Sequence, residues 1–94
     1  MPELSQPPSI RDLRVTRGLT WIADRLASTH PGFTMTTTDR ESTAREYVHT
    51  HYRDDRAANS AMWDLRDALP AILPGDTHDE YAARIRLHIQ EVSA

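Results

Sequence analysis

The feature that most constrains this chain is a long stretch, from Phe33 to Leu69, that contains neither glycine nor proline. Because an α-helix repeats every 3.6 residues, positions that recur at alternating spacings of four and three share one helical face. Within the stretch such positions are occupied by Ala44, Val48, His51, Asp55, Ala58, Met62, Leu65 and Leu69. The stretch therefore predicts helix, and we call these residues the seam.

The centre of the seam is polar. His51 and Asp55 stand on it, and residues 53–56 form a run of four charged side chains. Two arrangements fit this pattern: one long helix with a polar notch, or two helices that meet within the charged run. We favour two helices, because a single helix of this length is far longer than the average of about 11–12 residues.

A further helix is predicted on each side of this stretch. Before it, apolar residues again recur at spacings of four, three and four: Val15, Leu19, Ile22 and Leu26. Ser9 is suited to cap the start of this helix, and the His-Pro-Gly sequence at 30–32 is expected to end it. After the stretch, Thr77 and Glu80 form a capping box that predicts the start of the last helix.

These elements predict an all-α fold, a compact bundle of three to four helices. Residues 1–8 contain three prolines and are expected to form an extended N-terminal arm, with 9–94 as a single helical domain. A chain of 94 residues has room for one small domain. Leu, Ile, Val and Phe make up only 17 residues, but a net charge of −3 does not oppose compaction.

Composition also narrows the classes of protein. The absence of cysteine excludes disulfides and cysteine-based zinc sites. The first residues contain neither a basic segment nor an apolar one, so no secretory signal is expected. No apolar run approaches the roughly 18 residues that a membrane span needs. We therefore expect a cytoplasmic protein with no membrane partner.

No residue pattern indicates catalysis or cofactor binding. The serines and threonines lie in no nucleophile motif, and the three glycines are too far apart for a phosphate-binding loop. Glu46 and His49 have the spacing found in di-iron bundles, but such sites need a second copy and two more glutamates. The sequence therefore predicts a non-catalytic protein without a metal or cofactor.

The arginines of the first helix offer one functional hypothesis. All eleven basic residues are arginine, and Arg14, Arg17 and Arg25 lie with Trp21 on the side opposite the apolar stripe. A basic face with an aromatic side chain can contact phosphates and stack on bases, as in a small DNA-binding regulator. Alternatively, Trp21 packs on another helix and the arginines are ordinary surface. The overall acidity of the chain disfavours nucleic acid.

The seam offers the hypothesis that we favour. Its candidate contact residues are Val48, His51, Asp55, Met62, Leu65 and Leu69. The seam presents more helix surface than one thin core needs when it is taken together with Trp21, Met35, Tyr47, Tyr52 and Trp63. Small domains often complete their core by oligomerising. His51 of one chain is suited to face Asp55 of a second across a two-fold axis. The sequence thus predicts a helical protein–protein interaction or regulatory module, self-associating, whose protein partner is otherwise unknown. The alternative is that helices of the same chain cover the seam.

Overall fold

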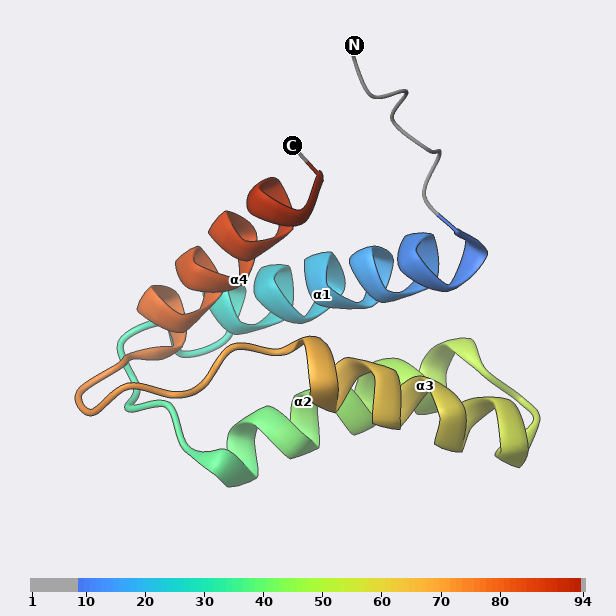
Figure 1. Ribbon diagram of the computed structural model, residues 1–94. Helices are drawn as coiled ribbons and strands as arrows, with labels where there is room; N and C mark the ends of the chain where they lie inside the picture. Colours follow the sequence, from blue (N-terminus) through green and yellow to red (C-terminus); the bar gives the residue numbers. More distant parts are fainter. Residues whose placement is uncertain (1–8, 94) are drawn as a thin grey trace, which may run out of the picture.

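Four helices make up most of the structure, a computed structural model that describes residues 9–93 (Figure 1). They are α1 (Ile10–Ser28), α2 (Thr37–His51), α3 (Asp55–Ala68) and α4 (His78–Ser93). Extended pairing among the described residues is limited to one antiparallel bridge between Thr34 and Thr77. The predicted all-α bundle is therefore confirmed, with four helices. The N-terminal arm predicted for residues 1–8 lies outside the described residues.

The polar centre of the seam is the point at which the chain changes direction. α2 ends at His51, and the backbone of its C-cap, Tyr52, is extended. α3 begins at Asp55, and the side chain of Asp54 accepts a hydrogen bond from the Ala57 amide at 2.9 Å. Aspartate favours such a position because its carboxylate supplies the acceptor that first-turn amides lack. Of the two arrangements that fit the sequence, the structure has two helices.

The capping residues at the starts of α1 and α4 form the predicted hydrogen bonds. Ser9 Oγ accepts a hydrogen bond from the Asp12 amide at 3.0 Å, and the Asp12 carboxylate accepts one from the Ser9 amide at 3.3 Å. At the start of α4, the Thr77 hydroxyl accepts a bond from the Glu80 amide at 3.2 Å. Side chains thus satisfy first-turn amides that have no partner within the helix.

α1 lies at the centre of the bundle, with α4 on one side and the α2–α3 pair on the other (Figure 1). α1 packs against all three other helices, whereas the backbone of α4 approaches no described helix except α1. The core takes side chains from every helix, among them Leu19, Ile22, Leu26, Ala44, Tyr47, Val48, Met62, Leu65, Tyr81 and Ile85. A chain with few large aliphatic residues thus builds one core around its first helix.

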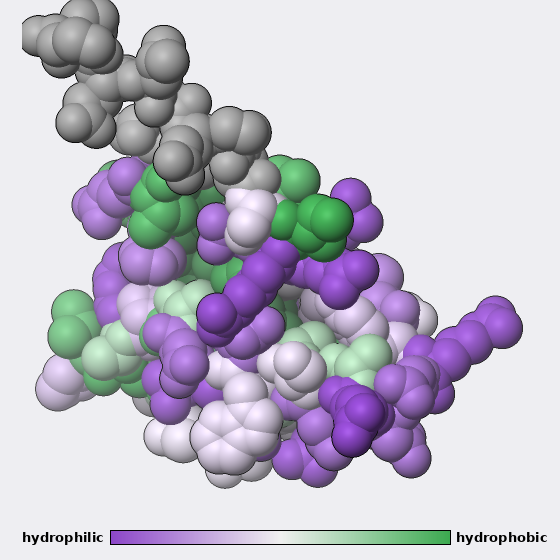
Figure 2. All heavy atoms as spheres, turned by 45° about the vertical axis from the view of Figure 1, so that its right-hand side comes forward, coloured by the Kyte–Doolittle hydropathy of each residue, from purple (hydrophilic) through white to green (hydrophobic). Residues whose placement is uncertain are grey.

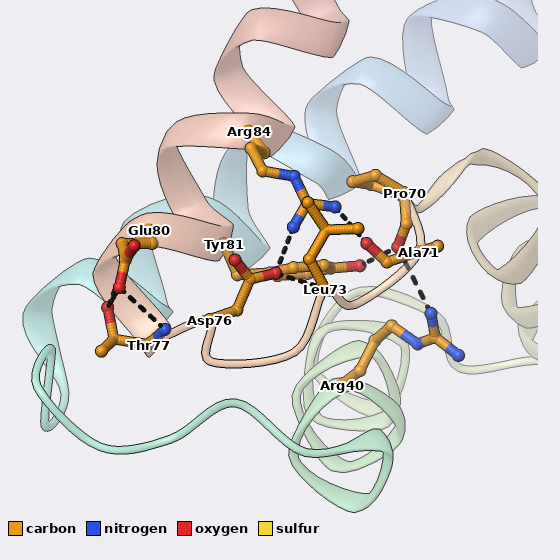
Figure 3. A network of polar contacts seen from close by, with 9 residues as sticks. All are labelled: Arg40, Pro70, Ala71, Leu73, Asp76, Thr77, Glu80, Tyr81 and Arg84. Carbon is orange, nitrogen blue, oxygen red and sulfur yellow. Dashed lines mark hydrogen bonds and ion pairs between the residues drawn. The ribbon is translucent and has the colours of Figure 1, made fainter.

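Polar contacts tie the segment between α3 and α4 to α2 and α4 (Figure 3). The Tyr81 hydroxyl donates to the Pro70 carbonyl at 2.5 Å, and Arg40 of α2 donates to the same oxygen at 3.3 Å. Arg84 of α4 forms an ion pair with the buried Asp76 carboxylate. These contacts add a second attachment for α4, whose backbone packs on α1 alone.

Candidate interaction surface

The apolar residues of the seam lie in the core of the chain that carries them. Val48, Met62, Leu65 and Leu69 are each no more than 8% exposed. α2 and α3 fold back on each other, and α1 packs against both, so these side chains face the interior of one chain. The expectation that they meet a second chain is therefore corrected. Their spacing marks a common face, and helices of the same chain cover it.

The polar members of the seam are exposed, and they do not face each other within the chain. The His51 ring stacks on Tyr47, with ring centres 4.3 Å apart, and its Nδ1 lies 2.9 Å from the Tyr47 carbonyl oxygen. Asp55 is the first residue of α3, beyond the change of direction. The extended backbone between the two helices separates them, so His51 belongs to an aromatic cluster on α2.

The four residues of the predicted basic face on α1 have different surroundings in the structure. Trp21 is half-buried and packs on α2, with ring centres 5.5 Å from Tyr47 and 6.0 Å from His51. Arg25 forms an ion pair with Glu46 of α2 at 2.9 Å. The side chains of Arg14 and Arg17, by contrast, make no hydrogen bond or ion pair with any residue that the structure describes. The four residues therefore do not form one face, and Trp21 takes the alternative of packing on another helix.

The two halves of α1 differ in burial. All the buried residues of this helix lie in its second half: Gly18, Leu19, Ile22, Ala23 and Leu26. From Ile10 to Arg17 no residue is fully buried, and the side chains of Ile10 and Leu13 are 69% and 53% exposed. In the first half of α1, Ile10 and Leu13 therefore form a small apolar ridge, among charged residues, that helices of the same chain leave largely uncovered.

A groove of about 360 Å³ runs between this half of α1 and α3. Its apolar lining includes Val15, Ala61 and Leu65, and the rings of Tyr47 and Tyr52 contribute from α2 and its C-cap. Its charged lining residues are Arg11, Arg14 and Asp64, of which Arg11 and Asp64 form an ion pair at 2.7 Å. Figure 2 turns this end of the bundle forward, and apolar patches there alternate with strongly polar side chains.

Trp63 lies on α3 outside the seam and next to groove-lining residues, and it is one of the aromatic residues that the sequence indicates for an interface. It is 63% exposed, and the Arg66 guanidinium lies 5.1 Å from the centre of its ring. Ser60 and Asp64, three residues before and one after it, both line the groove. The sequence does indicate that Trp63 is exposed. Position 63 falls between the seam positions 62 and 65, so its side chain projects from another face of the helix.

His78 is at the centre of a separate group of polar contacts. It is buried, with Nδ1 3.1 Å from the Thr29 carbonyl oxygen and Nε2 3.2 Å from the Asp39 carboxylate. The hydrogen bond from His78 is the main cause that lowers the pKa of the Asp39 carboxyl below its ordinary value. Ser42 lines a small pocket with His78, but both ring nitrogens face acceptors, so neither is placed to take a proton from a hydroxyl.

The residue pattern weighed for a metal does not converge in space. Glu46 pairs with Arg25, and His49 is exposed. Across residues 9–93, no group of three or more His, Asp or Glu side chains is arranged to hold a metal ion.

No protein-family model, curated protein or solved structure matches this chain. Among the helices that the structure describes, none combines the length and the apolar character needed to cross a membrane.

Proposed function

We propose that this chain is a small, non-catalytic protein–protein interaction module of the cytoplasm that associates with a second copy of itself. The first half of α1 and the groove beside it form the contact surface. The observation that supports this proposal is the uncovered ridge of α1, on which Ile10 and Leu13 project from a chain that has few large apolar residues.

The expected strength of the association follows from the size of this surface. Burial of an isoleucine or leucine side chain contributes about 1.5–3 kcal/mol. Association also costs several kcal/mol in lost translational and rotational freedom. In a symmetric dimer four such side chains, Ile10 and Leu13 of each chain, contribute about 6–12 kcal/mol. The net association is therefore weak, and the concentrations to test reach from about 1 µM to about 1 mM.

The test is the mass of the chain in solution, measured by analytical ultracentrifugation across that concentration range. The unmodified chain should rise towards twice its 10.7 kDa, and the double variant Ile10→Asp/Leu13→Asp should remain a single chain. Acidic residues near a helix N-terminus interact favourably with the helix dipole, so the double variant should keep its helical content.

Leu87→Asp is the matched control, because Leu87 is a comparably exposed apolar side chain on α4, and this variant should associate normally. A single-chain mass at every concentration would overturn the proposal. So would association that the double variant leaves unchanged.

Nucleic-acid binding is a second candidate, favoured by the lack of described partners for Arg14 and Arg17. It is weaker, because Arg11 and Arg25 are already paired with carboxylates and Trp21 is held against α2. If phosphates bind here, affinity should fall steeply with salt, and Arg14→Gln/Arg17→Gln should flatten that dependence while Arg25→Gln should not. Absence of binding to a DNA duplex at low salt would remove this candidate.

A further inference from the structure

We propose that the groove between α1 and α3 receives Trp63 from a second copy of the chain, and that Trp63 of the first chain enters the groove of the second. This inference rests on the proposed function and names the contact by which the module would associate.

The placement of Trp63 is the first argument. Its side chain projects from α3 without lining the groove, while its neighbours Ser60 and Asp64 do line it. Trp63 is the i+3 neighbour of Ser60, so it projects from α3 next to one edge of the groove. A two-fold symmetric contact can use a projecting residue and a nearby hollow, because each chain then offers both parts. A second Trp63 can thus fill the groove while the first fills its counterpart.

The chemistry of the groove is the second argument. An indole ring favours tilted contact with other aromatic rings, which the half-buried Tyr52 offers in the groove lining, and attraction to a guanidinium. Arg14 lines the groove and has no partner among the described residues, so its charge is available to the ring. A buried indole also needs an acceptor for its N–H group. The Asp64 carboxylate has lone pairs left beside its bond from Arg11.

Size and residue type are the third argument. A volume of about 360 Å³ lies at the lower end of the range of ligand pockets, about 300–1,000 Å³, and suits one large side chain. Tryptophan is among the residues that most often dominate interface energetics. Trp63 has the largest side chain among the exposed apolar residues that the structure describes.

Complementation between two variants tests the reciprocal contact. Trp63→Ala removes the projecting ring and keeps the groove, whereas Ala57→Phe fills the groove and keeps the ring. Loss of one dominant interface residue weakens binding on the order of 30-fold. Each variant alone disrupts both halves of the symmetric interface and should be monomeric where the unmodified chain dimerises. A mixture of the two should form a heterodimer through its one intact half, on the order of 30-fold weaker than the unmodified dimer.

Two further measurements guard against misfolding of the groove variant. Arg14→Ala removes the guanidinium without filling the groove, and it should also weaken association. In a Trp21→Phe background, Trp63 is the only tryptophan, and its fluorescence should shift to shorter wavelength as concentration rises. Leu87→Ala, on α4, is the control and should dimerise normally.

Three results would overturn the inference: a chain that stays monomeric to about 1 mM, a Trp63→Ala variant that dimerises normally, or a mixture that forms no heterodimer. The first would also remove the proposed function. If Ile10→Asp/Leu13→Asp dissociates the dimer but Trp63→Ala does not, the proposed function stands and the Trp63 contact is wrong.

Discussion

Gly18 lies where α1 packs tightly against side chains of α2 and α3. A Cβ atom at this position would lie 2.7 Å from Leu65 Cδ2 and 3.0 Å from Tyr47 Cε2, whereas carbon atoms pack at about 3.5–4.0 Å. Both neighbours are buried, so they have little room to move. The missing side chain thus permits close packing, which offsets the weak helix propensity of glycine.

We expect Gly18→Ala to destabilise the chain although alanine is the better helix former. Alanine gains up to about 1 kcal/mol in helix propensity. Forcing a methyl group into a filled core costs about 1–3 kcal/mol, so the net loss should be about 1 kcal/mol, measured by urea denaturation.

The control is Gly32→Ala, because a Cβ there meets nothing within 4 Å and Gly32 does not have a positive φ. This variant should match or exceed the parent in stability. A Gly18→Ala variant more stable than the parent would contradict the prediction.

At the scale of elements, His78 joins the ends of three helices. It is the first residue of α4, it contacts the carbonyl of Thr29, the C-cap of α1, and it meets Asp39 in the first turn of α2. Its two ring nitrogens thus reach one acceptor at the end of α1 and another on α2. This contact supplies a side-chain link between α2 and α4, whose backbones do not approach each other.

Asp39 should give the chain a measurable sensitivity to acid. Its pKa in the folded chain lies below the value of 3.8 for the free side chain, so the unfolded chain binds more protons in this range. The stabilisation is therefore present above about pH 4 and is lost as the pH falls through the lower, folded pKa. We expect the urea midpoint to fall less between about pH 6 and about pH 3 in Asp39→Asn than in the parent.

Glu41 provides the comparison, because a hydrogen bond from Arg66 is the main cause that lowers its carboxyl pKa. Glu41→Gln should reduce the acid sensitivity in the same direction. An Asp39→Asn variant that keeps the full acid sensitivity of the parent would show that the contact with His78 contributes nothing.

At the scale of the whole molecule, local signals predicted the helices well and their surroundings poorly. The caps at Ser9 and Thr77 act within one turn, so their effect can be read from neighbouring residues. The spacing of the seam identifies residues that share a face, but it carries no information about which surface covers that face. α1 covers the apolar residues of the seam. The extended backbone at Tyr52, where α2 ends, turns Asp55 away from His51.

The same distinction between local spacing and the packing of distant helices explains what the sequence shows of the candidate surface. Trp21 follows the buried Gly18 by three residues, so it borders the apolar stripe of α1 and reaches Tyr47. The groove arises where α1 meets α3, across the 53 positions that separate Arg11 from Asp64. No periodicity within one helix records how two helices so distant in sequence approach each other.

Because α1 lies at the centre of the bundle, the order of synthesis sets how long each of its sides stays exposed. Ribosomes release α1 first and α4 only after α2 and α3, yet α4 packs against α1 on the side opposite the α2–α3 pair. At a rate of about 5–20 residues per second, the α2–α3 pair has seconds in which to dock before α4 is available. Until α4 docks, the side of α1 that it covers stays open, a surface for a chaperone to shield.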